Sequence, residues 1–271
     1  MIKTVIGLIG LFFMMSCSVS NNFHNPYIRT DNFEKINRVR FNEMREAVNE
    51  LVYIGELIDT VALDTLKTQN HFNFDLTNTI KNSNGALKIK VDLNQKLAYD
   101  LEKLSIPPVP ILLDSIKIVF DSIETRKQLE KWENRKRNYV DAIPVTIINS
   151  TKETTWLVQQ DFQILMIQEA KDIHDKWKPI EYWNFSNCGN SYGRITLKSN
   201  EIAIFKILKY SGDFKTEIRL KIRNGNQTYY SKPFKGSVNL KQFEIPEEQF
   251  SERDLNKKES EKLIEKIFLK D

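Results

Sequence analysis

Reactive side chains are sparse in this chain, which has two cysteines and three histidines. Cys188 lies in the stretch SNCGNSYG, and His174 precedes it by fourteen residues. A cysteine nucleophile needs a base within hydrogen-bond reach and a donor for the oxyanion. The surrounding residues do not match the papain-type signature, which has a second cysteine ahead of an aromatic residue. We therefore expect a buried or loop cysteine and no enzyme, with a hydrolase that uses Cys188 as nucleophile as the alternative.

The histidines do not predict a metal site. His24, His71 and His174 form no His-x-x-x-His pair and do not stand beside paired carboxylates that would suggest zinc. With nine glycines in 271 residues, the chain also shows no glycine-rich phosphate loop and no Gly-x-Ser-x-Gly motif. We expect no metal and no cofactor.

Aromatic and amide side chains gather in the segment KWKPIEYWNFSNCGNSYG. Such side chains are the materials of a carbohydrate or peptide contact surface. The candidate ligand-binding residues are Trp183, Phe185, Asn187, Asn190 and Tyr192. The alternative, which we favour, is that Trp177, Tyr182 and Trp183 partly fill a core and that the Asn/Ser/Gly run is a loop.

The chain begins with an apolar run of eleven residues, from Val5 to Met15, that follows Lys3. A membrane-spanning helix needs about 20 apolar residues. The run is too short to span a bilayer and suits the apolar part of a secretory signal. We expect residues 1–16 to be a signal peptide.

The stretch Met14-Met15-Ser16-Cys17 resembles the lipobox of bacterial lipoproteins, with Met14 where leucine is usual. The resemblance implies that the signal is cut before Cys17 and that Cys17 carries the lipid. Each buried methylene of an acyl chain contributes about 0.8 kcal/mol to membrane binding. The expected location is the bacterial cell envelope, periplasmic or surface-facing, with residues 17–30 as a flexible tether to the membrane.

Composition agrees with a folded, exported protein. The chain is 41% hydrophobic and 28% charged, which is ordinary globular usage. The formal net charge of +4 is too weak to indicate nucleic-acid binding. Once Cys17 is acylated, Cys188 is the only thiol, so we expect no internal disulfide.

Residues 31–140 predict an α+β region. Asp31 and Glu34 have capping-box spacing, and apolar residues recur at near-helical intervals up to Gly55. ALKIKVDL alternates apolar and polar residues, which predicts a strand over 86–93. Residues 94–105, with Leu97, Leu101 and Leu104, and residues 121–139 predict two further helices.

Residues 143–246 predict an all-β domain, because short strand-like segments recur every eight to twelve residues with turn residues between them. Asn224-Gly225-Asn226 predicts a tight hairpin. The order LKSNEIAIFKI, GDFKTEIRLKI, GNQTYYS resembles the later strands of immunoglobulin-like domains, which implies an antiparallel sandwich and carries no function. The chain lacks the family's cysteine pair, and Phe214 stands where a tyrosine corner would be.

The charged tail, residues 247–271, predicts a helix with Leu263, Ile264, Ile267 and Phe268 on one face. We favour a helix that folds back on its own domain, and the alternative is a helix that docks on a partner.

Four tripeptides, each Asp followed by Thr or Ser and then by an aliphatic residue, resemble the acceptor motif of a bacterial O-glycosylation system. The candidate acceptors are Thr60, Thr65, Ser115 and Ser122. Taken together, the sequence predicts a non-enzymatic, membrane-anchored module that binds an envelope protein, a glycan or a host ligand. The alternative is an envelope hydrolase that uses Cys188.

Overall fold

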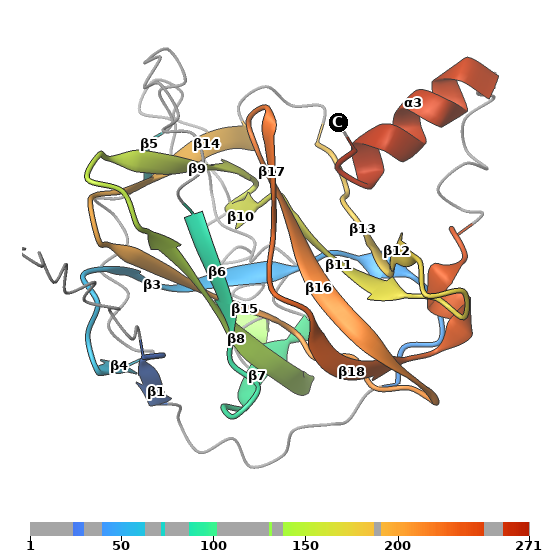
Figure 1. The fold of residues 1–271 in the computed structure, drawn as a ribbon, viewed down its shortest axis with the longest axis horizontal. Coiled ribbons are helices and arrows are strands. Elements are labelled where there is room, and N and C mark those ends of the chain that lie inside the picture. The colour runs from blue at the N-terminus through green and yellow to red at the C-terminus, as the bar shows by residue number, and fades with distance from the viewer. Residues whose placement is uncertain are drawn as a thin grey trace, which may run out of the picture.

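The computed structural model describes residues 24–29, 40–62, 72–73, 87–101, 130–131, 138–186, 191–246 and 257–270. These residues are mostly strand, in several largely antiparallel sheets, with one helix at the C-terminus (Figure 1). No helix among them is both long enough and apolar enough to cross a bilayer.

The first sheet has the order β3-β15-β8-β6, and β7 pairs with the other end of β8. Its strands are β3 (Asn49–Gly55), β6 (Leu87–Val91), β7 (Leu97–Asp100), β8 (Tyr139–Asn149) and β15 (Ile202–Leu208). Every residue of β15 is buried, because both faces of the sheet are covered. Ile202, Ile204 and Leu208 face a first apolar cluster, whereas Phe205 and Ile207 face a second.

The second sheet has the order β12-β11-β16-β17, and β18 pairs with the first half of β16. Its strands are β11 (Met166–Lys171), β12 (Trp177–Pro179), β16 (Phe214–Asn224), β17 (Gln227–Tyr230) and β18 (Phe234–Val238). The predicted hairpin is confirmed, since Asn224 pairs with Gln227 across a two-residue loop. Gly225 has a φ of 61°, a conformation that glycine adopts without steric cost.

A third sheet and two short parallel pairs complete the β-structure. The third sheet contains β10 (Gln163–Ile164), β9 (Thr155–Gln160), β14 (Tyr192–Leu197) and β5 (Phe72–Asn73), in that order. The parallel pairs are β1 (Tyr27–Arg29) with β4 (Thr60–Ala62) and β2 (Arg45–Glu46) with β13 (Glu181–Tyr182). The second apolar cluster takes side chains from all three sheets and includes Ile147, Leu157, Ile195, Phe205 and Leu220.

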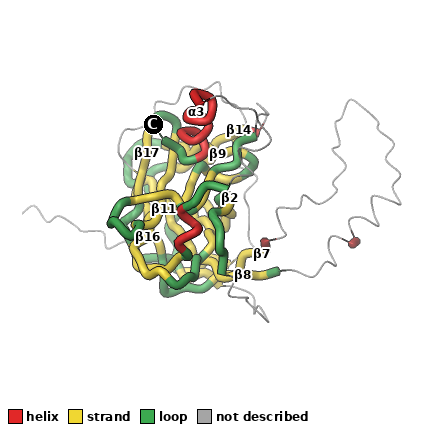
Figure 2. Tube along the Cα trace, turned by 90° about the vertical axis from the view of Figure 1, so that its right-hand side faces the viewer, coloured by secondary structure: helices red, strands yellow, loops and turns green. Residues whose placement is uncertain are grey.

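The predicted C-terminal helix is present as α3 (Lys257–Ile267), and it folds back on the same chain. Ile267, Phe268 and Leu269 are buried in a third apolar cluster with Trp183. The Trp183 backbone N–H donates to the Ile267 carbonyl at 2.7 Å. α3 lies at the same end of the molecule as β14 and β17 (Figure 1, Figure 2).

The predicted helix that ends near Gly55 is wrong in its described part, which forms β2 and β3. Val48 and Val52 face the first cluster, whereas Leu51 faces the second. Val52 has no partner in β15, where Ile204 pairs with Tyr53 and Phe205 pairs with Leu51. This bulge and the two buried faces remove the simple alternation of a strand and leave apolar residues at helix-like spacing.

The predicted helix over 94–105 is also wrong, because residues 97–100 form β7 and all four are buried. Pairing with β8 outweighs the helical preference of this segment. The predicted strand at 86–93 is confirmed as β6. Leu104 and most of 121–139 lie outside the described residues, although Glu130 and Lys131 are helical.

The two regions predicted from sequence, 31–140 and 143–246, share the first sheet. β8 runs through the expected boundary at 141–144 and pairs with β6 and β7 before it and with β15 after it. β3 covers the other side of β15. The strands before residue 140 are therefore part of the same packing unit as those after it.

A buried carboxyl group ties the second sheet to the segment after β15. Glu181 is 3% exposed. Its Oε2 accepts the Gln168 backbone N–H at 2.7 Å, and its Oε1 accepts from Gln168 Nε2 at 3.0 Å and from the Tyr210 hydroxyl at 2.8 Å. Burial raises the pKa of Glu181 to about 7, against the lowering effect of these hydrogen bonds and of Arg45.

A fragment from Ala142 to Glu247 should not fold cooperatively, because it lacks β3, β6 and β7 and so exposes both edges of the β8–β15 pair. Thermal unfolding followed by circular dichroism, with residues 18–271 as the control, measures this. A fragment that melts cooperatively with β-type ellipticity would show that the earlier strands are dispensable.

The Glu181 carboxyl should make the folded state less stable as the pH rises from about 4.5 to above 7. A pKa that is higher in the folded chain favours folding below the unfolded value and loses that contribution as the group ionises. The expected loss is about 3 kcal/mol for the shift from 4.5 to about 7. Urea unfolding at pH 5 and pH 8 measures how the free energy of unfolding changes with pH in the wild type and in Glu181→Gln. An equal change in the two chains would contradict the prediction.

Candidate functional site

The aromatic segment singled out in the sequence is only partly at the surface. Trp183 is 3% exposed and belongs to the third cluster, and its indole N–H donates to Gln160 Oε1 at 3.0 Å. Phe185 is half-buried, with its ring edge-on to Trp183 at 6.4 Å and Lys266 Nζ 4.4 Å from its centre. These contacts place the Trp183 ring in the core beneath α3.

Tyr192 is half-buried on β14, opposite Gln160 of β9. Gln160 therefore connects the Trp183 and Tyr192 positions, by a hydrogen bond to one and by strand pairing with the other. Burial raises the pKa of the Tyr192 hydroxyl, and nearby Asp161 raises it further. Asn187, Cys188 and Asn190 lie outside the described residues.

A small hollow adjoins this segment, with a volume of about 150 Å³ and with Glu46, Gln160, Trp183, Asn184 and Phe185 among its lining residues. Burial raises the pKa of the Glu46 carboxyl, although a hydrogen bond with Asn184 lowers it. The hollow is smaller than the ~300–1,000 Å³ of typical ligand sites. It fits one side chain or a few water molecules better than a ligand.

The other candidate residues lie apart. His24 pairs with Asp59 at 2.8 Å, and the His174 backbone N–H donates to Asp172 Oδ1 at 2.9 Å. No three histidine, cysteine, aspartate or glutamate side chains among the described residues are placed to hold a metal ion. Cys17 and His71 lie outside the described residues.

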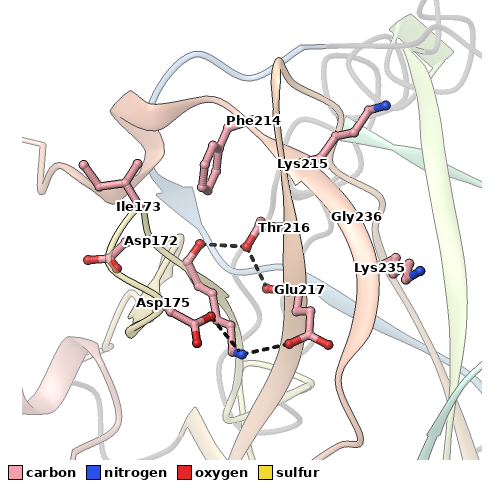
Figure 3. A pocket seen from close by; sticks show the side chains of 10 residues that line it. Asp172, Ile173, Asp175, Phe214, Lys215, Thr216, Glu217, Lys235 and Gly236 are labelled. Carbon is pink, nitrogen blue, oxygen red and sulfur yellow. Dashed lines mark hydrogen bonds and ion pairs between the residues drawn. The ribbon is translucent and has the colours of Figure 1, made fainter.

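Two larger hollows adjoin Phe214, the first residue of β16. The first has a volume of about 600 Å³ and lies between the β11–β12 turn and the strands β16 and β18 (Figure 3). The second has a volume of about 540 Å³. Together we call them the Phe214 groove, lined by Asn42, Lys171–Ile173, Asp175, Asp213–Glu217, Lys235, Gly236 and Asn239–Lys241.

Asp172 builds the turn that forms one wall of the groove. Its Oδ1 accepts the backbone N–H groups of His174 and Lys176 at 2.9 and 3.0 Å, and its Oδ2 lies 3.0 Å from Lys178 Nζ. The hydrogen bond from Lys176, together with those of the other partners, lowers the pKa of Asp172 to about 2. The turn at 172–175 is therefore held by a charged side chain, and it presents Ile173 with 65% of its surface exposed.

Lys171 joins this turn to β16. Its Nζ lies 2.9 Å from both Asp175 Oδ1 and Glu217 Oε2 (Figure 3). The Glu217 and Asp175 hydrogen bonds raise the pKa of Lys171. The Thr216 hydroxyl donates to the Lys171 carbonyl at 2.7 Å, so side chains and backbone both fix this wall.

Phe214 is fixed from the opposite side. Its ring meets Phe243 edge-on at 6.4 Å, and both rings pack against the first cluster. Asn239 donates to the Phe41 carbonyl at 2.9 Å and to Asn42 Oδ1 at 3.1 Å, which fixes the second hollow. A Cβ at Gly212 would lie 2.1 Å from the Val238 carbonyl carbon, so only glycine allows this close packing at the start of β16.

The four lysines and four carboxylates that line the groove balance, and Arg40 and Lys178 beside it leave a surplus of two positive charges. The carboxylates that line it all have a cationic partner, since Asp172 pairs with Lys178, Asp175 and Glu217 pair with Lys171, and Asp213 pairs with Arg40. Lys215, Lys235 and Lys241 are exposed and have no partner in the part of the chain that the structure describes. The groove thus combines an apolar surface with a cationic rim.

Sequence reasoning missed this site because its residues come from four separated segments. Each segment alone is an ordinary charged turn or strand end. The only local signals are Ile173 in a charged turn and Leu240 after β18, which is 52% exposed.

No protein-family model matches this sequence, and no curated protein is significantly similar to it.

Trp183→Ala should lower the free energy of unfolding by about 3–5 kcal/mol, because it removes a buried ring and the donor to Gln160. Tyr192→Ala, at a half-buried position, should cost clearly less. Denaturant unfolding of both variants measures the difference. A change below about 0.5 kcal/mol for Trp183→Ala is typical of an exposed side chain and would contradict the core assignment.

Proposed function

We propose that this protein is an exported lipoprotein of the bacterial cell envelope, held on a membrane by a lipid on Cys17. The apolar run at 5–15 followed by Ser16 and Cys17 supports this, as does the polar tether that follows. A lipid on Cys17 would leave the β-sheets outside the bilayer. The tether expected over 17–30 is shorter than that range, because Tyr27–Arg29 form β1 and Ile28 is buried.

The protein works as a non-enzymatic binding module, and the Phe214 groove is its contact surface. One observation carries this proposal. The exposed apolar side chains of Ile173 and Leu240 lie in the same groove as lysines that have no partner in the described chain. Concave surfaces with apolar walls and a few polar groups are the usual form of binding sites. Charges left without partners contribute little to the stability of the fold.

An immunoglobulin-like antiparallel sandwich that also includes the earlier strands β3, β6 and β7 is the fold we propose behind this surface. The second apolar cluster supports it, because the first sheet meets the other two there. The groove lies at one end of the second sheet, where the β11–β12 turn, β16 and β18 form the walls of its first hollow.

The anchoring part of the proposal is tested by Cys17→Ala. Cells fed a clickable palmitate analogue should label the wild type and not the variant, and the variant should leave the membrane fraction after a carbonate wash. Cys188→Ala is the matched control and should stay labelled and membrane-bound. A Cys17→Ala chain that remains in washed membranes would overturn the anchor.

A further inference from the structure

We infer that the Phe214 groove binds an acidic peptide segment that carries large apolar side chains. This inference rests on the proposed function, since it names the partner of the same surface. It is carried by three features of the groove, which are its exposed apolar residues, its uncompensated positive charge and its fixed walls.

The apolar side chains at the groove are largely exposed to solvent. Ile173 is 65% exposed and Leu240 is 52% exposed, and they line the hollows on either side of the half-buried Phe214. Covering apolar surface is favourable, because it removes that surface from water. A partner that places apolar side chains in both hollows gains from this burial.

The charge around the groove indicates that the partner is negatively charged. Lys215 and Lys235 line the first hollow and Lys241 lines the second, and none of the three has a partner in the described chain. Their neighbouring carboxylates are already occupied by Lys171, Lys178 and Arg40. Because Lys171 is shared by two carboxylates, the surplus around the groove is two positive charges, which attracts carboxylates and repels amines.

The walls are already in place without a partner. Lys171 links the Asp172 turn to Glu217, and the Phe243 ring packs edge-on against the Phe214 ring. Gly236, which lines the first hollow, packs tightly against Ile218. A Cβ at this position would lie 2.4 Å from Ile218 Cδ1. A surface fixed in this way loses little conformational entropy on binding.

The concave shape favours a peptide over a bilayer. Hollows of about 600 and 540 Å³ can each receive a large side chain. A flat, anionic membrane surface would meet the lysines and the tips of Ile173 and Leu240 but would not enter the hollows. Both partners are anionic, so the experiment must separate them.

The test uses full-length chain with Cys17→Ala, so that no lipid contributes to binding. Fluorescence anisotropy measures the binding of three labelled peptides: one alternating Glu with Leu and Phe, one with Lys in place of every Glu, and one with Ser in place of every apolar residue. Only the first should bind, and added salt should weaken it. Flotation with phosphatidylglycerol vesicles is measured in parallel.

The variants locate the site. Lys215→Glu/Lys235→Glu/Lys241→Glu should weaken binding of the first peptide at least tenfold, and so should Ile173→Ser/Leu240→Ser. Lys88→Glu/Lys152→Glu/Lys198→Glu makes the same change in charge at exposed lysines outside the groove, and Phe162→Ser removes an equally exposed apolar residue. Both controls should bind as the parent does.

Three results would overturn the inference. The first is equal binding of the Glu and Lys peptides, the second is equal weakening by the groove and control variants, and the third is binding to vesicles without binding to any peptide. Because lipid attachment is measured separately with Cys17, failure of the peptide inference leaves the anchoring result standing, and the reverse also holds.

Discussion

The fold depends on a sheet that is buried on both faces. All seven residues of β15 are buried, and so are nine of the eleven residues of β8 beside it. Such a pair of strands is stable only when each face is covered by other elements, because exposed apolar surface is unfavourable on either side. The third sheet and part of the second meet one face at the second cluster, whereas β1, β4 and other residues of the second sheet, such as Ile218 and Val238, meet the other face at the first cluster.

Buried polar contacts then fix how these layers meet. Glu181 receives hydrogen bonds from Gln168 of β11 and from Tyr210 just after β15, so one carboxyl holds two layers together. The Phe214 groove lies away from Glu181, but it is formed by the same second sheet that Glu181 helps to hold in place. Residues 212–214 pack on the end of β18, and β16 begins there and runs back through the second sheet. The rigid walls around Phe214 are thus an outcome of how the sheets pack.

Sequence patterns identified the strands after residue 143 well, because most of them are short and separated by clear turns. The Asn224-Gly225 hairpin is the best case, since local backbone preference alone decides it. β3 was missed because Val52 forms a bulge and because its side chains face two apolar clusters. The Phe214 groove was missed because no local pattern shows that the 172–175 turn lies beside β18. The favoured interpretation of Trp183 as a core residue is confirmed, because its ring is buried with residues of β11 and of the end of α3.

The Lys206–Glu50 ion pair has a consequence for how the chain reaches this structure. The two residues are direct partners in the β3–β15 register, their charged atoms lie 3.0 Å apart, and both side chains are largely buried. A slip of one residue along either strand would move a charged group to the face that Phe205 occupies, where the second cluster holds only apolar side chains. Together with the buried amides of Asn49 and Asn149 in the same sheet, this pair discriminates against misaligned pairings of strands whose faces are otherwise largely apolar.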